Sequence, residues 1–397
     1  MNRVEEILRE LAPRVLAVLV KRYGQFDQCE DAVQEALLAA ALQWPRDGVP
    51  ANPTGWLVTV AGRRWTEQWR SDRARRRREQ TVYRQDAGAE PSDQDDELTL
   101  ILLCCHPALS VPSQVALTLR AVGGLTTAEI ARALLVPEST VGQRISRAKQ
   151  QIRSAGTRFE LPPPDQLPAR VAAVRQVLYL IFNEGYTASS GPALQRVQLT
   201  AEAIRLTRQL YARRPGDGET AGLLALMLLT DARRDARTAP DGSLVPLEEQ
   251  DRQRWDRDAI AEGTVLVEAT LATTEVGPFQ LQAAIAAVHD QAASAQATDW
   301  PQILVLYDLL VTVAPGPMTT LGRIVALSMV EGPEAGLRAL AEAEGVLTGH
   351  HRLHAVRAHL LDRAGDHEAA RSEYEVAARR TLSVLEQRYL LGRARSQ

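Results

Sequence analysis

Apolar residues recur along almost the whole chain at intervals of three and four positions, which is the period of an α-helix that buries one face. No segment bounded by turn residues keeps the apolar–polar alternation that a half-buried strand requires. The pattern therefore predicts an all-α protein.

Two stretches interrupt this periodicity. RQDAGAEPSDQDDE (84–97) holds six acidic residues without an apolar pattern, and ELPPPDQLP (160–168) holds four prolines. Clustered charges, glycine and proline are typical of connecting segments. We therefore expect two linkers, an acidic one at 84–97 and a Pro-rich one at 160–168. They would separate three helical domains, at 1–83, 98–159 and 169–397.

LTTAEIARALLVPESTVGQRISRAKQQIR (125–153) has the pattern of a helix-turn-helix. Thr126 and Glu129 have the spacing of a capping box at the start of its first helix. The spacing of four apolar residues predicts the buried face of the second helix: Val141, Ile145, Ala148 and Ile152. Residues suited to contact phosphates and base edges in a major groove lie elsewhere on that helix: Ser139, Thr140, Gln143, Arg144, Arg147 and Lys149. A helical hairpin with a solvated basic face is the alternative.

An arginine-rich helix is predicted from NPTGWLVTVAGRRWTEQWRSDRARRRRE (52–79). Asn52 suits the helix cap and Pro53 the first helical position. Arginines spaced seven apart line one stripe that can neutralise phosphates: Arg63, Arg70 and Arg77. The tryptophans among them, Trp56, Trp65 and Trp69, can stack on unpaired bases, and packing in the core is the alternative.

The preceding segment, DQCEDAVQEALLAAALQW (27–44), predicts a helix capped by Asp27 with Glu30. Its buried face would hold Cys29, Val33, Ala36, Leu37 and Ala40, and its other face Glu30, Asp31, Gln34, Glu35 and Leu38. An acidic face with an apolar member suits a basic protein partner.

Charge places polyanion contact in the N-terminal part of the chain. Residues 1–158 hold 22 Lys and Arg against 19 Asp and Glu, whereas the remainder holds 24 against 30. No apolar run is long enough to span a membrane and no basic leader precedes one, so we expect a cytoplasmic protein. Cys29, Cys104 and Cys105 lack metal-site spacing and suit buried thiols, so we expect no metal and no cofactor.

In this order, the three motifs resemble the sigma-70 family, in particular the extracytoplasmic-function (ECF) sigma factors. Residues 27–45 resemble region 2.2, residues 52–79 regions 2.3 to 2.4, and residues 98–153 region 4. The resemblance implies that the acidic linker is the connector that runs through the polymerase. Gly142 departs from the family pattern, because many region 4 helices carry a basic residue there.

The resemblance also implies partners and site residues. Core RNA polymerase would be bound through its β′ clamp helices by Asp31, Gln34, Glu35 and Leu38, with its β flap as a further contact. The minus-ten element of promoter DNA would be engaged by Trp56, Arg63, Arg64, Trp65 and Arg70. The minus-35 element would be read by the six residues named for the second helix of the helix-turn-helix.

Four motifs in the long C-terminal part resemble one ECF subgroup, group 42, whose extension is like tetratricopeptide repeats (TPR). They are VLYLIFNEGYTASSG (177–191), LLALMLLTDARRDAR (223–237), LEEQDRQRWDRDAIAEG (247–263) and LQAAIAAVHDQAASAQATDWPQILVLYDLL (281–310). Independently, residues 358–377 keep the spacing of one such repeat, and Gly332 precedes Gly365 by about one repeat period. A stack of this kind offers a concave surface to a protein or to another part of the same chain.

Asn183, Glu184 and Tyr186 are candidates for a ligand or interdomain contact. No neighbouring residue completes a catalytic set with them, which favours a structural role. We therefore expect a sigma factor with no enzymatic activity, whose C-terminal domain controls or supports its function. A one-component helix-turn-helix regulator that responds to a ligand or a protein is the alternative, and an enzyme with a DNA-binding head is a remote third.

Overall fold

The computed structural model describes residues 3–76, 93–134, 136–155, 161–187, 195–347 and 351–396. Within these ranges the chain forms α-helices and short 3-10 helices, and the one β-type pairing is an isolated bridge between Thr238 and Leu244. The predicted all-α fold is confirmed. The chain divides into two compact units, Met1–Leu180 and Ile181–Gln397.

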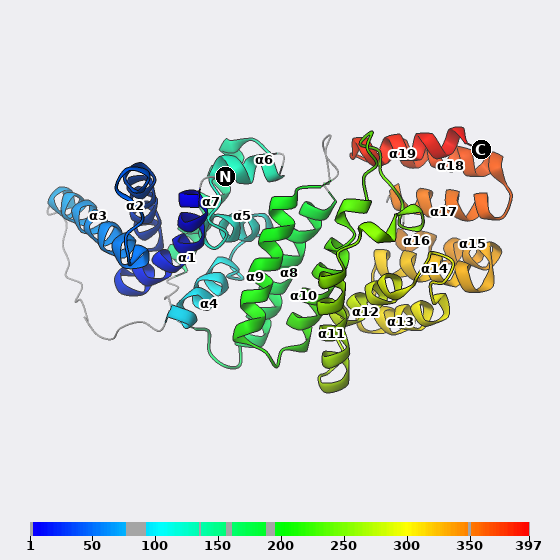
Figure 1. Ribbon diagram of the computed structural model, residues 1–397, viewed down its shortest axis with the longest axis horizontal. Coiled ribbons are helices and arrows are strands. Elements are labelled where there is room, and N and C mark those ends of the chain that lie inside the picture. The colour runs from blue at the N-terminus through cyan, green and yellow to red at the C-terminus, as the bar shows by residue number, and fades with distance from the viewer. Residues whose placement is uncertain are drawn as a thin grey trace. The chain divides into compact units, whose positions relative to one another are not determined.

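The first unit contains α1 (Arg3–Tyr23), α2 (Phe26–Asp47), α3 (Pro53–Arg76), α4 (Asp93–Cys104), α5 (Val111–Ala121), α6 (Thr127–Leu134) and α7 (Glu138–Ser154) (Figure 1). The division between the units falls inside α8 (Leu167–Tyr186), beyond the Pro-rich segment. The first part of α8 groups with the first unit, and its residues Val171, Val174 and Val177 are buried.

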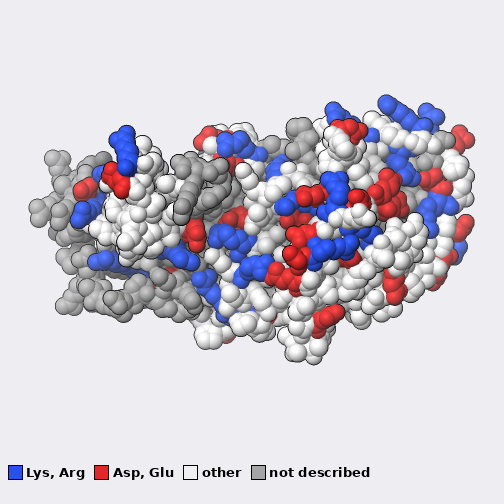
Figure 2. Space-filling view, viewed as in Figure 1, with Lys and Arg blue, Asp and Glu red and all other residues white. Residues whose placement is uncertain are grey.

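The second unit contains α9 (Val197–Arg213), α10 (Gly218–Asp231), η1 (Arg234–Ala236), η2 (Leu247–Glu249), η3 (Arg252–Arg254), α11 (Arg257–Thr273), α12 (Pro278–Gln291), α13 (Trp300–Val313), α14 (Pro317–Glu331), α15 (Pro333–Glu342), α16 (Glu344–Leu347), α17 (His351–Arg363), α18 (His367–Arg380) and α19 (Val384–Arg395). Figure 2 shows acidic and basic side chains intermingled over the visible face of this unit. This mixture of signs gives no single charged surface there.

Helices α1, α2 and α3 pack together through small residues. Ala32, Ala36 and Ala40 of α2 and Ala61 of α3 are fully buried, so the helix backbones approach closely. Helix α3 begins at Pro53, and the Asn52 side chain accepts a hydrogen bond from the backbone nitrogen of Gly55 at 2.8 Å. The predicted start of this helix is confirmed, because Asn52 satisfies a backbone donor that the first turn leaves unpaired.

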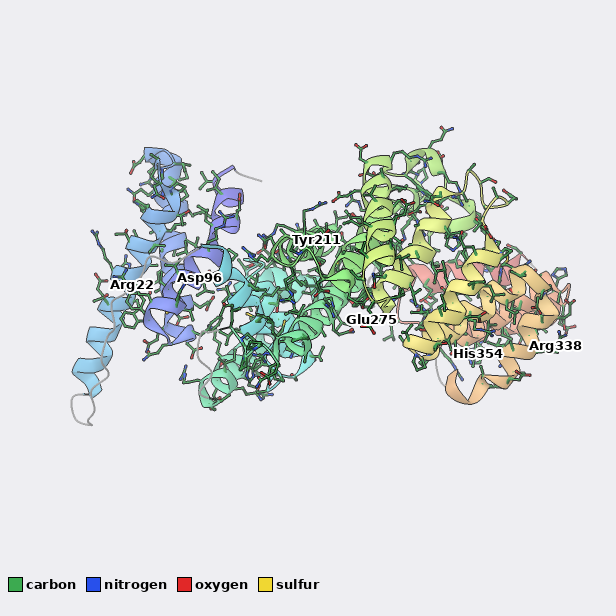
Figure 3. The ribbon with its side chains drawn as sticks, turned by 90° about the horizontal axis from the view of Figure 1, so that it is seen from below. Arg22, Asp96, Tyr211, Glu275, Arg338 and His354 are labelled. Carbon is green, nitrogen blue, oxygen red and sulfur yellow. The ribbon has the colours of Figure 1, made fainter. Side chains whose placement is uncertain are left out.

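Helix α4 begins inside the segment predicted as an acidic linker. Asp96 lies near the start of this helix, where a negative charge is favourable. Asp96, labelled in Figure 3, is buried. It accepts a hydrogen bond at 2.8 Å from Lys21 of α1. The end of the predicted linker is therefore helical, and Asp96 is part of the packed structure.

The helix-turn-helix is formed by α6 and α7 and packs on α5. Thr126 and Glu129 make the predicted capping box, since the Glu129 carboxylate accepts from the Thr126 nitrogen at 2.8 Å and Thr126 Oγ1 accepts from the Glu129 nitrogen at 3.1 Å. The four residues predicted to form the inner face of α7 are all buried: Val141, Ile145, Ala148 and Ile152.

Helix pairs build the second unit. Helices α17 and α18 pack closely through Ala358, Ala370, Tyr374 and Ala377, which share one buried cluster. Gly365 joins this pair and Gly332 joins α14 to α15, and both have positive φ angles, of 86° and 97°. A left-handed conformation favours glycine at such turns, which explains the spacing of these two residues in the sequence.

A buried ion pair lies between the helices of the second unit. Arg233, which lies between α10 and η1, donates from Nε to Asp290 of α12 at 2.6 Å, and the two residues are only 8% and 1% exposed. The Arg233 guanidinium also lies 5.6 Å from the centre of the Trp255 ring. This arrangement fixes the loop that carries Trp255 against α10 and α12.

His289, beside this ion pair, should make the second unit sensitive to acid. Burial and then the charges of Arg233 and Arg252 lower the pKa of His289 from 6.5 to about 4. As the pH falls, the unfolded chain binds this proton before the folded chain does, so acid favours unfolding. When the pH is lowered from about 7 to about 5, His289 should lower the free energy of unfolding by about 2 kcal/mol.

The variant His289→Gln isolates this effect. Asp290 has the opposite effect on the native chain. Burial raises the pKa of its carboxyl, so the folded state gains stability relative to the unfolded state as the pH falls. Hydrogen exchange of the α12 amides, corrected for the intrinsic rate, should show a smaller loss of protection at the acidic pH in the variant than in the native chain. Equal losses in the two proteins would contradict the role of His289.

Candidate functional site

Helix α7 presents part of its polar surface to solvent. Ser139, Gln143 and Arg147 are exposed and follow one another at intervals of four residues, on the side away from the buried face. Thr140 and Arg144 are half-buried beside them. The exposed side chains include a hydroxyl, an amide and a guanidinium, which can contact phosphates and base edges in a major groove.

Lys149, the sixth residue predicted to contact DNA on α7, does not share this exposure. Its side chain is 13% exposed, and Nζ donates a hydrogen bond at 2.6 Å to Glu30 of α2. Gly142 lies on the same side of α7, and a Cβ atom added there would meet no atom within 4 Å. The lysine is therefore engaged within the chain, while the space beside Gly142 is open.

Helix α3 carries two exposed arginines near its middle, Arg63 and Arg64. Arg64 forms ion pairs with Glu35 of α2 at 3.6 Å and with Glu67 at 3.5 Å. Arg70 lies on the same helix, and its side chain is outside the described part of the chain. Arg64, which is predicted to contact DNA, thus lies beside Glu35, which is predicted to contact protein.

Trp65 and Trp56 of α3 differ in exposure, and the side chain of Trp69 lies outside the described part of the chain. Trp65 is 5% exposed, and its ring stacks on Tyr23 of α1 with the centroids 4.1 Å apart. Trp56 is half-buried and meets the edge of Trp44 of α2, at a centroid distance of 5.6 Å. Trp65 therefore fills the core in this structure, which is the alternative that the sequence left open, and Trp56 retains some accessible surface.

Helix α2 exposes an acidic and apolar stripe, formed by Asp31, Glu35, Leu38 and Leu42. These residues follow one another at spacings of four, three and four, so they lie on one side of the helix. Leu38 and Leu42 are each 63% exposed, whereas Gln34 is half-buried. The sequence prediction omitted Leu42, although its spacing from Leu38 was the available signal.

Two predictions for α2 were wrong. Glu30 was assigned to the exposed acidic face, but it is 4% exposed and is bound by Arg120 of α5 and Lys149 of α7. Asp27 was assigned to cap the helix, but α2 begins at Phe26 without a side-chain cap and Asp27 pairs with Arg153. Both carboxylates pair with cations of other helices. These ion pairs take the place of the capping interaction predicted for the start of α2.

The motif near the end of α8 makes contacts within the second unit. Glu184 forms an ion pair with Arg196, and the Arg237 guanidinium lies 3.5 Å from the centre of the Tyr186 ring. Asn183 is exposed. Residues 188–191, which complete the motif, lie outside the described residues. Glu184 and Tyr186 thus tie α8 to neighbouring segments, as a structural role for the motif requires.

The three cysteines are buried, as predicted, and burial raises the pKa of the Cys29 and Cys105 thiols to about 12. Among the residues that the structure describes, no group of three histidine, cysteine or acidic side chains has a geometry suited to hold a metal ion. No helix in the described ranges has the length and apolar character needed to cross a membrane.

Three parts of the chain match known protein families. Residues 7–76 match the family "Sigma-70 region 2", residues 99–152 match "Sigma-70, region 4", and residues 170–271 match "Family of unknown function (DUF6596)". An uncharacterized protein of Rhizobium meliloti (strain 1021) is 37% identical over 393 residues, which cover 95% of this chain and 92% of that protein. No solved structure matches the chain significantly.

Proposed function

The chain belongs to the sigma-70 family, and from this premise we propose that it is an ECF-type sigma factor that binds core RNA polymerase and directs it to a subset of promoters. The observation that carries the proposal is the presence of region 2 and region 4 in one chain, with the outer side of α7 open to solvent. The chain itself performs no chemistry in this role.

In the proposed complex, α7 lies in the major groove of the minus-35 element. Ser139, Gln143 and Arg147 support this role because they are exposed, with Thr140 and Arg144 beside them. Arginine and glutamine each recognise a base edge with two hydrogen bonds. Lys149 joins the DNA contacts once it is released from Glu30.

Helix α3 binds the minus-ten element in this proposal. Arg63 and Arg64 are exposed and supply phosphate contacts, with Arg70 further along the helix. Trp56 supplies the accessible aromatic surface for an unpaired base. Trp65 remains in the core in this proposal, because its stacking on Tyr23 supports the helix from inside.

The stripe on α2 binds the β′ clamp helices of the polymerase. Glu35 and Asp31 supply negative charge for a basic partner, and Leu38 and Leu42 supply apolar area for the centre of the contact. Gln34 lies beside them, and the β flap is the proposed partner of region 4. The partnership with polymerase places the protein in the cytoplasm.

The second unit is proposed to be the TPR-like extension of ECF group 42, which controls or supports sigma activity. The helix pairs joined by Gly332 and Gly365 support this assignment. Stacked helix pairs of this kind bind a protein partner or another part of the same chain. The contacts of Glu184 and Tyr186 hold the first helix of the extension in place, and Asn183 stays available for a partner.

Run-off transcription from a pool of genomic promoters tests the proposal. The full chain, added to core polymerase, should give promoter-specific transcripts. Replacing Gln143 and Arg147 together with alanine should lower these transcripts by about 10- to 100-fold, because two base-edge contacts are lost. Arg371→Ala, which removes an exposed cation from α18, is the matched control and should leave the transcripts unchanged.

The same purified chain also distinguishes a sigma factor from the alternative function. A one-component regulator would protect an operator without polymerase and would give no new transcripts with it. Operator protection by the chain alone, together with no gain in transcription, would overturn the sigma-factor proposal.

A further inference from the structure

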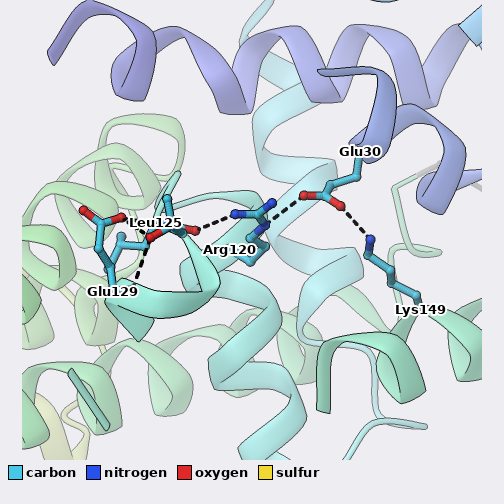
Figure 4. Close-up of polar contacts among 6 residues, drawn as sticks. Glu30, Arg120, Leu125, Glu129 and Lys149 are labelled. Carbon is cyan, nitrogen blue, oxygen red and sulfur yellow. Dashed lines mark hydrogen bonds and ion pairs between the residues drawn. The ribbon is translucent and has the colours of Figure 1, made fainter. Parts of the chain in front are cut away.

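The side of α7 next to its exposed face is held by α2. Glu30 accepts a hydrogen bond from Arg120 Nε at 2.8 Å and another from Lys149 Nζ at 2.6 Å (Figure 4). The Arg120 and Lys149 side chains are only 16% and 13% exposed, and the Glu30 side chain is 5% exposed. One buried carboxylate therefore binds a cation from each of two region 4 helices, in charge-assisted hydrogen bonds.

A second ion pair extends this contact along α7. Asp27 of α2 pairs with Arg153, which follows Lys149 by one helical turn. Between the two helices lies a pocket of about 340 Å³, whose lining residues include Asp31, Gly142 and Ser146. The acidic start of α2 thus faces one flank of α7 over more than one turn.

This flank is where a recognition helix meets the DNA backbone. An α-helix is about 10–12 Å across and the major groove is about 12 Å wide, so a docked helix has a sugar–phosphate strand along each flank. Lys149 and Arg153 are the cations that α7 carries on this flank. The carboxylates of Glu30 and Asp27 therefore occupy positions that phosphates would take.

We infer that α2 of region 2 is an intramolecular binding site for α7 of region 4, which holds the promoter-reading helix closed until DNA replaces the carboxylates. The inference rests on the proposed function, since it assigns promoter reading to α7. A closed and an open arrangement compete, and DNA binds the open one. The apparent affinity for DNA is then reduced in proportion to the fraction of chains that are open.

The contact also connects the two proposed binding surfaces, which are the polymerase-binding stripe of α2 and the DNA-binding surface of α7. Asp31 belongs to the polymerase-binding stripe of α2 and lines the pocket beside α7. Docking of a basic polymerase surface on α2 would compete for this end of the helix. Opening of α7 and binding of polymerase are therefore coupled, and the free chain has low affinity for DNA.

Variants of α2 test the closed arrangement in the full chain. Glu30→Gln removes the shared charge, and Asp27→Asn removes the second, more exposed pair and serves if Glu30→Gln does not fold. Asp47→Asn is the matched control, because it removes the same charge from an exposed position at the far end of α2. Affinity for a short DNA duplex of arbitrary sequence is measured by fluorescence anisotropy, without polymerase.

Spin labels report the arrangement independently of DNA. Leu42→Cys and Gln150→Cys place labels at exposed positions of α2 and α7, whereas the native cysteines are buried and resist labelling. In the native background the distance between the labels should have one narrow distribution. In the Glu30→Gln and Asp27→Asn backgrounds it should broaden.

The expected result is roughly tenfold tighter DNA binding for Glu30→Gln, a smaller gain for Asp27→Asn and none for Asp47→Asn. Unchanged label distances, unchanged DNA affinity, or an equal gain with Asp47→Asn would each overturn the inference. Failure of the proposed function is seen separately, as an absence of promoter-specific transcripts with polymerase. In that case, the label distances and the affinity for arbitrary DNA would still show whether the closed arrangement exists.

Discussion

Reversing Asp31 and Glu35 to lysine is expected to weaken binding of the chain to core RNA polymerase by at least about 100-fold. Both residues are exposed on the side of α2 that also carries Leu38 and Leu42. The substitution replaces attraction to a basic partner by repulsion at two neighbouring positions. Because the side chains are on the surface, the free energy of unfolding should change little.

The control is Asp47→Lys, a charge reversal on the same helix away from the stripe. Polymerase affinity of the control should remain within about twofold of the native value, since charges separated by more than a screening length interact weakly. Anisotropy of the labelled chain, titrated with core polymerase, measures both variants. An unchanged affinity of the double variant would remove α2 from the polymerase contact.

The helix-turn-helix could be predicted from the sequence because its determinants are local. Thr126 and Glu129 are one turn apart, and the apolar residues of α7 repeat with the helical period, so neighbouring residues were sufficient. The same holds for the helix cap at Asn52. At these positions the local chemistry agrees with the tertiary structure.

The error at Glu30 has a different cause. Glu30 follows the buried Cys29 and lies at the edge of the apolar face of α2, where periodicity does not indicate what covers it. Its partners, Arg120 and Lys149, are 90 and 119 residues away in sequence. An acidic residue at this edge fits a solvent-exposed surface and an intramolecular ion pair equally well, so the sequence alone could not distinguish them.

Trp65 illustrates a similar ambiguity. An aromatic residue among arginines can stack on a base or on another aromatic residue, and Tyr23 lies on a helix that the local pattern does not connect to α3. The ion pair of Arg233 and Asp290 was also missed, because its two residues are 57 positions apart. Long-range pairing of polar groups is thus the part of this fold that periodicity does not reveal.

The buried ion pair of Arg233 and Asp290 is expected to contribute strongly to the stability of the second unit. Asp290→Asn is expected to lower the free energy of unfolding of the second unit by about 3–5 kcal/mol, because it leaves the Arg233 guanidinium buried without its counter-charge. Asp308→Asn is the control, since Asp308 pairs with Arg323 on the surface at 2.5 Å and the loss there should be below about 1 kcal/mol. Hydrogen exchange of the α10 and α12 amides measures both losses.

Replacing both partners distinguishes the loss of a charge from the loss of packing. In Arg233→Met combined with Asp290→Leu, neither charge of this buried pair remains, so most of the lost stability should return. A double variant as unstable as Asp290→Asn would instead assign the stability to the stacking of Arg233 on Trp255. A loss below about 1 kcal/mol for Asp290→Asn would mean that water reaches Arg233, because a solvated guanidinium does not need the carboxylate.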